Sequence, residues 1–448
     1  MRRVEKFAGA LLLASAFAPA AAAQAHGGAS AERPPAGGRG GTFQASERLV
    51  AGGPQDFTQV RHVVLRGSNF EIGRKLAEIA ATRHGVTIEP SPDRWRTRAK
   101  RNYLTRYYPG QVERMRGVAA HFGADARDDA SMFFHLYYGF GTPGCSVVYY
   151  PPHTTEDGQG VLSRNFDFTT GTFEGRMPGP GEAAVCAQPY VLELYPNQGY
   201  ASLSVCAFDL LGGVVDGINS EGLSIALLAD DLSPDAPRPA PGPQAGFDVL
   251  EIGRYLLENC ATVEQARNIL LEARLYYSAI PCHYLIADRN GTSLVWENDA
   301  SMHFGHVFEG DGRPQIATNA LRHRRPPRAA PHREADASCE RHERVHARIT
   351  AHAGKFSREA ILANSACIAA EAPPPPPPAA AHRTLWHALY YPQRRAMEVS
   401  FYLGDDGGGA AGGGAAGGGE ADSPAPPGDD AAPKVRRSEY LRFELRTP

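Results

Sequence analysis

The sequence contains no long run of apolar residues and no marked excess of either charge. A helix needs about 20 consecutive apolar residues to cross a bilayer; the apolar run over residues 7–18 is too short to be a membrane anchor, and no later stretch approaches that length. The formal net charge is -3, and the basic residues are scattered rather than clustered, which argues against a nucleic-acid partner. The phosphate-binding pattern Gly-x4-Gly-Lys-Ser/Thr is also absent. We therefore expect no stable membrane span, no nucleic-acid partner and no nucleotide held by a phosphate loop.

Cysteine is scarce, with Cys at 7 of 448 positions. None stands in the Cys-Gly-x-Cys-aromatic context of a papain-type nucleophile. In an exported protein up to six cysteines could pair and leave one free thiol, and the sequence does not show whether any pair forms. Cys339, His342 and His346 could face a zinc ion from one side of a helix, but no fourth ligand is evident. A charged, exposed helix explains their spacing better, so we expect no metal and no cofactor.

The start of the chain has the pattern of a secretory signal: a basic opening, a short apolar run and small-x-small sites. This pattern predicts a cleaved signal peptide over residues 1–25 and export to the periplasm or the exterior. Residues 26–60 begin rich in Gly, Ala and Pro and are predicted to be a disordered lead-in. With 42% hydrophobic residues, the rest can bury the core of one large domain or two ordinary ones.

The most informative stretch, residues 143–168, is predicted to form a β-hairpin. Its first half is aromatic and β-branched, as strands prefer. Pro-Pro and Asp-Gly turn signals follow, and the second half alternates apolar and polar residues. The hairpin returns Arg164 and Asp167 to the start of its first strand, where Cys145 stands. A thiol, a guanidinium and a carboxylate are therefore expected to converge.

The Gly144-Cys145 pair, followed by Arg-Asn-x-Asp over residues 164–167, resembles the N-terminal nucleophile hydrolases, in particular the isopenicillin N acyltransferase-like and choloylglycine hydrolase families. In those families the protein cleaves its own Gly-Cys bond, and the new N-terminal cysteine attacks amides. The resemblance implies that Cys145 is the nucleophile, that Asp167 positions its freed α-amine, and that Arg164 supports the thiolate or the carboxylate. A nearby cation favours the reactive thiolate. An α-amine, with a pKa of about 7.7–8.0, can act as the base.

Further segments extend the resemblance over residues 63–445. Asn319, in a Thr-Asn pair, matches an active-site asparagine that, with backbone donors, would hold the oxyanion. Arg341 lies in a segment that resembles the family's Ser-x-x-Arg and is a further candidate site residue. Asn219 also matches, and we interpret it as a structural turn residue. About ten residues after Asn219 the family often has a second asparagine that donates to the oxyanion. This chain has Ala229 and two aspartates there, so the sequence does not identify the second oxyanion donor.

The resemblance implies an α+β fold, a four-layer αββα sandwich. A helical pro-segment, residues 61–144, would stay packed after cleavage on the catalytic domain, residues 145–448. Apolar periodicity in the pro-segment predicts helices over residues 70–80, 107–122 and 128–138.

Two low-complexity insertions interrupt the predicted catalytic domain. Residues 372–381 contain six consecutive prolines and are predicted to be an extended spacer. Residues 404–433 are rich in Gly, Ala, Asp and Pro and are predicted to be disordered, because they are too poor in apolar residues to pack. A last strand is expected over residues 440–445.

Each assignment has a structural alternative. Cys145 could be a buried small hydrophobe or a disulfide partner, and Arg164 and Asp167 could form a plain salt bridge. Asn319 could cap a turn, and Arg341 could be one charge on a solvated helix. The protein could also be a catalytically silent, unprocessed binding protein on the same fold. We favour a self-processing cysteine hydrolase or acyltransferase acting on the linear amide bond of a small acyl-amide.

Overall fold

The structure, a computed structural model, describes residues 42–139, 144–179, 182–230, 245–277, 280–298, 304–324, 336–373, 375–406 and 434–446. All of them lie within residues 34–448, which form one unit. The predicted signal peptide lies outside the described residues, as do residues 26–41 and residues 407–433.

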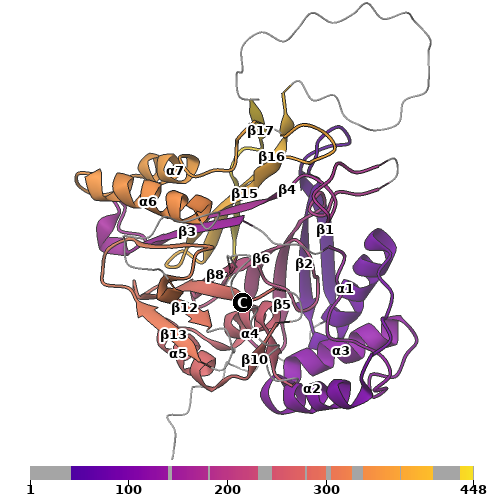
Figure 1. The fold of residues 1–448 in the computed structure, drawn as a ribbon. Helices are drawn as coiled ribbons and strands as arrows, with labels where there is room; N and C mark the ends of the chain where they lie inside the picture. The colour runs from indigo at the N-terminus through magenta and orange to yellow at the C-terminus, as the bar shows by residue number, and fades with distance from the viewer. Residues whose placement is uncertain are drawn as a thin grey trace, which may run out of the picture. The chain divides into compact units, whose positions relative to one another are not determined.

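Nine of the described strands form one sheet in the order β1-β2-β5-β6-β7-β8-β11-β12-β13 (Figure 1). Neighbouring strands run antiparallel except β2 and β5, which are parallel. The strands are β1 (Gln44–Ala51), β2 (Val60–Gly67), β5 (Tyr190–Pro196), β6 (Ser202–Cys206), β7 (Asp216–Asn219), β8 (Ser224–Ala229), β11 (Cys282–Ala287), β12 (Ser293–Asn298) and β13 (Gly305–Glu309).

A second, antiparallel sheet contains seven of the described strands in the order β14-β3-β4-β15-β16-β17, with β18 also paired to β16. Its strands are β3 (Gly144–Tyr150), β4 (Val161–Thr169), β14 (Gln315–Thr318), β15 (His382–Tyr391), β16 (Ala396–Asp405), β17 (Val435–Arg437) and β18 (Leu441–Glu444). A short parallel pair, β9 (Phe247–Asp248) and β10 (Leu275–Tyr276), stands apart. The antiparallel β3–β4 pair confirms the predicted hairpin, and β18 confirms the predicted last strand.

The described helices are α1 (Asn69–His84), α2 (Arg94–Tyr107), α3 (Pro109–His121), α4 (Val249–Asn259), α5 (Val263–Glu272), α6 (Asp336–Ala351) and α7 (Arg358–Ala366). Ser68 and Glu71 form a capping box that satisfies donors at the start of α1. Where α1 crosses α3, a Cβ on Gly73 would lie 2.1 Å from the Arg114 carbonyl oxygen, and one on Gly117 would lie 2.0 Å from that of Phe70. The two glycines therefore permit a backbone contact that any larger residue would prevent.

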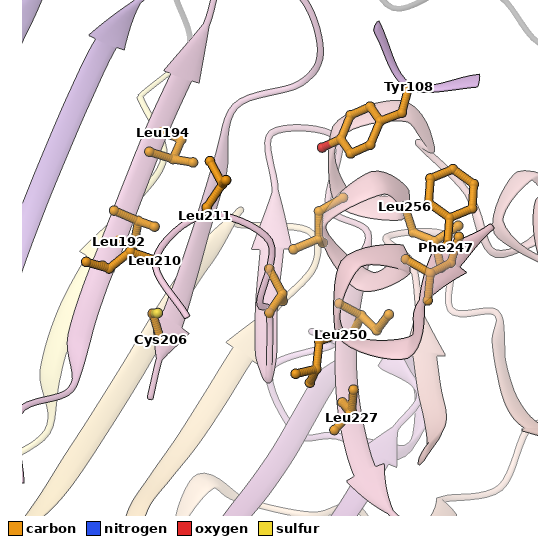
Figure 2. Packing of buried hydrophobic residues seen from close by; sticks show 14 of the residues in the cluster. Tyr108, Leu192, Leu194, Cys206, Leu210, Leu211, Leu227, Phe247, Leu250 and Leu256 are labelled. Carbon is orange, nitrogen blue, oxygen red and sulfur yellow. The ribbon is translucent and has the colours of Figure 1, made fainter. Parts of the chain in front are cut away.

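Three buried clusters separate four layers. The first lies between the nine-stranded sheet and α1, α3, α4 and α5, and Figure 2 shows part of it, with Leu192 and Leu227 from the sheet and Leu256 from α4. The second fills the space between the two sheets. The third lies between the seven-stranded sheet and α6 and α7. The predicted α+β, αββα architecture is confirmed.

The predicted lead-in is too long, because residues 44–51 form β1. Its side chains are mostly exposed, and the strand is held by its backbone pairing to β2. Polar edge strands of this kind lack the apolar alternation on which the prediction depends. The predicted pro-segment likewise begins with a strand, β2, rather than with a helix.

Among the three helices predicted in the pro-segment, two are confirmed as α1 and α3. The third, over residues 128–138, is wrong: this stretch consists of turns and isolated bridges. The Met132 N–H donates to the Glu89 carbonyl oxygen at 3.0 Å, the Leu136 N–H donates to the Asp209 carboxylate at 2.9 Å, and the Tyr138 N–H donates to the Phe208 carbonyl oxygen at 2.9 Å. Acceptors from outside the stretch thus bind N–H groups that a helix would need. The helix α2 was missed because it is rich in arginine and buries only Thr97, Lys100 and Leu104.

The prediction of an extended spacer over residues 372–381 is also wrong, because backbone groups of this segment are hydrogen-bonded to Gly175 and Met177. The Pro378 carbonyl accepts from the Met177 N–H at 2.8 Å, and the Ala380 N–H donates to the Gly175 carbonyl at 2.8 Å. Backbone groups make these contacts, so a composition poor in apolar side chains gave no sign of them. At the second insertion, Gly404 and Asp405 still belong to β16.

Candidate active site

Cys145 lies near the start of β3 on the face that points between the sheets. Its neighbours on that face are Val147 and Tyr149, whereas Val148 and Tyr150 point towards α6 and α7. The side chain of Cys145 is 0% exposed. The period-two alternation of a strand thus places the thiol in the apolar space between the two sheets.

Arg164 contacts the thiol directly. Its Nη2 donates to Cys145 Sγ at 3.1 Å and to the Leu227 carbonyl oxygen at 3.1 Å. Burial raises the pKa of the Cys145 thiol, while the charge and hydrogen bond of Arg164 act in the opposite direction. The guanidinium therefore stabilises negative charge on sulfur in a site that otherwise disfavours it.

The ion-pair partner of Arg164 is Asp216 on β7, in the other sheet. Arg164 Nε lies 2.8 Å from Asp216 Oδ2, and both side chains are 0% exposed. Asp216 also accepts hydrogen bonds from Trp386 Nε1 at 3.0 Å and from the Tyr390 hydroxyl. Burial raises the pKa of Asp216, and Arg164 opposes that shift. Sequence reasoning missed Asp216, although its place in the segment that contains Asn219 was a signal.

Asp167 lies opposite Gly144, the residue that precedes Cys145. Gly144 and Asp167 are paired across β3 and β4, and a Cβ at position 144 would lie 3.0 Å from the Cβ of Asp167. The Thr384 hydroxyl donates to Asp167 Oδ1 at 2.6 Å. Burial raises the pKa of Asp167, and the charge of Arg341 acts against this. Glycine at 144 thus allows the peptide bond to lie close to the carboxyl group.

Asn319 and Arg341 approach from the other edge of β3. Asn319 Oδ1 accepts from the Cys145 backbone N–H at 2.7 Å and from Arg341 Nη2 at 2.7 Å. Arg341 Nε donates to Ser146 Oγ at 3.2 Å. The pairing of β14 with β3 places Asn319 here, because Thr318 is the partner of Ser146. The structure therefore brings the other four predicted site residues together around Cys145, with contacts more specific than a turn cap or a solvated charge would require.

Where the family often has a second oxyanion asparagine, this chain has Ala229, and the backbone groups of Ala229 make the polar contacts there. The Ala229 carbonyl oxygen accepts from Asn319 Nδ2 at 2.9 Å, and the Ala229 N–H hydrogen-bonds to the thiol and lowers its pKa. The next residue, Asp230, is hydrogen-bonded to His283, with 2.8 Å between Oδ1 and Nδ1. Sequence reasoning gave no role to His283.

Asn219 is structural, as interpreted. Its Nδ2 donates to the Leu257 and Cys260 carbonyl oxygens at 2.8 and 2.7 Å, and its Oδ1 accepts from the Leu223 N–H at 2.9 Å. These bonds join the β7–β8 turn to the end of α4.

Two negative observations concern the described residues alone. None of their groups of His, Cys, Asp and Glu is arranged to hold a metal ion. No helix among them is long and apolar enough to cross a membrane. All seven cysteines are present as thiols.

The αββα layers and a cysteine at the start of a central strand define the class: the chain has the fold of the N-terminal nucleophile hydrolases. It belongs to the acyl-coenzyme A:6-aminopenicillanic acid acyl-transferase family, whose model matches residues 153–405. The match begins after Cys145 and includes Arg164, Asp167, Asn319 and Arg341. Family membership makes the protein an enzyme of the amide-hydrolysing and acyl-transferring type.

Solved structures with a similar arrangement have low sequence identity. A conjugated bile acid hydrolase from Clostridium perfringens is 15% identical, with 58% of this chain and 89% of that chain covered and a TM-score of 0.38. A penicillin V acylase from Agrobacterium tumefaciens is 16% identical, with 57% and 82% covered and a TM-score of 0.35. A Caenorhabditis elegans N-acylethanolamine-hydrolyzing acid amidase ortholog is 14% identical, with 56% and 93% covered and a TM-score of 0.34. Comparison with curated protein sequences gives no match.

Proposed function

We propose that this protein is a self-activating cysteine amidase or acyltransferase with Cys145 as its nucleophile. The supporting observation is that three side chains from two segments meet at this residue: Arg164 at the thiol and Asp167 beside Gly144, both from β4, and Asn319, which follows β14, at the backbone nitrogen. A neutral, structural thiol gains little from a guanidinium at 3.1 Å, whereas a thiolate gains a charge-assisted hydrogen bond.

Activation begins when Cys145 Sγ attacks the carbonyl carbon of Gly144. The C–N bond between the two residues breaks, the thiol proton passes to the nitrogen, and Gly144 is held as a thioester on Sγ. Water then adds to the thioester, which releases the Gly144 carboxyl group and restores the thiol. The cysteine now carries a free α-amine at a position where Asn319 Oδ1 lies 2.7 Å from the nitrogen.

Turnover uses that α-amine as the base. The amine takes the thiol proton, and the thiolate attacks the carbonyl carbon of an amide substrate. Asn319 and backbone donors hold the oxyanion; to do so, Asn319 Nδ2 exchanges its bond to the Ala229 carbonyl for one to the substrate oxygen. The ammonium returns its proton to the leaving nitrogen as the C–N bond breaks, and an acyl-cysteine forms. Water or a second amine then adds to the thioester carbonyl and releases the acyl group.

Arg164 and Asp167 have separate tasks in this scheme. Arg164 stabilises the thiolate from the side of the inter-sheet core, where Asp216 holds the guanidinium in place. Asp167 positions the α-ammonium through its charge, with its own carboxylate fixed by the Thr384 hydroxyl. Arg341 orients Asn319 through the shared oxygen Oδ1.

The decisive test is the mass and N-terminal sequence of the purified protein. We expect two fragments, the larger of which begins Cys-Ser-Val-Val, and we expect Cys145→Ala to remain one chain without activity. Cleavage that persists in Cys145→Ala would point to an external protease and remove the nucleophile assignment. A wild-type protein that stays intact would favour the silent binding protein.

The substrate is proposed only as a class, a small molecule with a linear acyl-amide bond. Purified, cleaved protein should be assayed against N-acyl amino acids, bile-salt conjugates, penicillins and N-acyl lactones, with and without an acceptor amine. Release of a free acid without the acceptor would indicate hydrolysis, and an acceptor-dependent amide would indicate transfer. We also propose export, and we expect the mature N-terminus of the exported protein close to residue 26.

A further inference from the structure

A buried histidine connects the two sheets beside the candidate site. His283 on β11 is 0% exposed. Its Nδ1 lies 2.8 Å from Asp230 Oδ1, and its Nε2 lies 2.8 Å from the Thr318 carbonyl oxygen. A carbonyl oxygen and an ionised carboxylate both accept hydrogen bonds and donate none. Both ring nitrogens therefore carry protons when Asp230 is ionised, and His283 is an imidazolium.

The two residues that His283 joins flank residues of the site. Thr318 precedes Asn319, which accepts from the Cys145 nitrogen, and Asp230 follows Ala229, whose carbonyl accepts from Asn319 Nδ2. β8 and β11 belong to the nine-stranded sheet, whereas β14 belongs to the seven-stranded sheet. His283 and Asn319 thus make two polar connections, side by side, across the interface between the sheets.

Most of the rest of that interface is an apolar cluster, and apolar burial is non-directional. Other polar contacts in it, from Arg164, Trp386 and Tyr390 to Asp216, are made by β4 and β15 and not by β14. The apolar cluster holds the sheets together but does not determine where the end of β14 lies relative to β8. Directional hydrogen bonds with fixed lengths do so, and the His283 bonds are of this kind.

The charged groups that face His283 favour the imidazolium. Burial opposes the charge, but the hydrogen bond and charge of Asp230, the charge of Glu297 on β12 and the bond to the Thr318 carbonyl outweigh it and raise the pKa of His283. Neither β14 nor β8 contains a titratable residue. Glu297 is itself held by the Arg322 and His323 N–H groups at 2.7 and 3.0 Å.

We propose that His283 is a positioning residue for Asn319: its imidazolium, paired with Asp230, fixes the Thr318 carbonyl and so holds Asn319 against Cys145. This inference rests on the proposed function of Cys145. It implies that loss of the His283 proton loosens one of the two bonds and displaces the oxyanion donor. A displacement of about 1 Å in such a group can reduce the rate on the order of a hundredfold.

The test uses the full chain, with activity expressed per cleaved molecule. Gln at position 283 can donate to Thr318 only by placing its oxygen towards the Asp230 carboxylate, so His283→Gln should lower kcat at least about tenfold. Asp230→Asn keeps both bonds with a neutral imidazole, because the new amide donates to Nδ1 while Nε2–H stays on Thr318. Its kcat should lose the alkaline decline that follows His283 deprotonation in the wild type.

The matched control is His62→Gln. His62 on β2 forms another buried histidine–carboxylate contact, 2.9 Å from Glu193 on β5 in the same sheet. It should alter melting temperature without altering kcat or the pH profile. If His283→Gln lowers only the melting temperature, as the control does, or if Asp230→Asn keeps the wild-type pH profile, the proposal is overturned. A His283→Gln chain that stays uncleaved while His62→Gln is cleaved supports it, because the same geometry serves the first acyl shift.

An independent measurement separates this inference from the proposed function. In ¹⁵N spectra, His283 should show two protonated ring nitrogens at neutral pH, and Asp230→Asn should convert it to the neutral form. A neutral ring in the wild type refutes the inference whether or not Cys145 is the nucleophile. Activity that survives Cys145→Ala instead refutes the proposed function and leaves the spectral result unchanged.

Discussion

Arg114 and Arg164 are both completely buried beside a carboxylate, and they differ in what else they contact. Arg114 on α3 lies 2.7 Å from Glu258 on α4, and the Tyr108 hydroxyl contacts the same carboxylate. Arg164 on β4 lies 2.8 Å from Asp216 and also donates to a thiol at 3.1 Å. Desolvation is costly in both places. The first pair joins two helices, whereas the second places positive charge at the Cys145 thiol, the proposed nucleophile.

The largest effect is expected from removing each guanidinium in turn. Arg114→Met and Arg164→Met each leave a buried carboxylate unpaired, which costs on the order of 3–5 kcal/mol of stability. Only Arg164→Met should also reduce kcat/KM, by at least about a hundredfold, because it alone removes charge from the thiolate. Urea unfolding gives the first quantity, and activity per folded molecule gives the second.

Arg114→Met with the added change Glu258→Gln should recover part of the lost stability, because no buried charge remains. Equal activity losses in Arg114→Met and Arg164→Met would mean that neither guanidinium is specific to the chemistry. The distinction drawn between the two pairs would then be wrong.

A smaller effect on stability is expected from Asp167→Asn, which keeps the size of the side chain and removes its charge. Loss of one positioned acid–base partner should reduce turnover on the order of a hundredfold. Asp288→Asn is the matched control, since Asp288 is also buried and accepts from the Val263 and Asn290 N–H groups at 2.9 Å. The control should lose stability and keep turnover; initial rates on the cleaved fraction distinguish the two outcomes.

The smallest effect on activity is expected for His387, a buried histidine whose ring contacts the Ser163 and Tyr440 hydroxyls rather than a carboxylate. Burial lowers the pKa of His387 to about 3 and that of His84 to about 4, from about 6.5 in an unfolded chain. Between these values the unfolded chain binds more protons, so stability rises with pH. His387→Gln should flatten this rise between pH 3 and pH 6.5, and His84→Gln should do so less. Unfolding free energies at several pH values would show it, and an unchanged slope in His387→Gln would contradict it.

Local pattern predicted those parts of the site that lie close together in sequence. The β3–β4 hairpin follows from strand propensity and turn residues, and its register places Arg164 and Asp167 beside Cys145. Asp216 and His283 were not predictable in the same way. Each comes from the other sheet, and only the packing of one sheet on the other brings it to the site.

The errors have a common physical origin as well. Residues 128–138 have the apolar spacing of a helix, but the Glu89 and Phe208 carbonyl oxygens and the Asp209 carboxylate bind N–H groups of the stretch that a helix would need. β1 and residues 375–381 are held by backbone hydrogen bonds, which composition does not reveal. Pattern analysis detects side-chain burial, and it fails where the backbone makes the contact.

The parallel pairing of β2 with β5 has a consequence for how the protein refolds. β2 precedes Cys145 and β5 follows it, so a chain cut before Cys145 consists of two polypeptides that share one sheet. An uncut chain regains that sheet in a first-order reaction. A cut chain must first bring two molecules together, so its recovery becomes second-order and slows on dilution. The working lifetime of the cut enzyme would therefore be set by its rate of unfolding, because an unfolded molecule would refold only slowly.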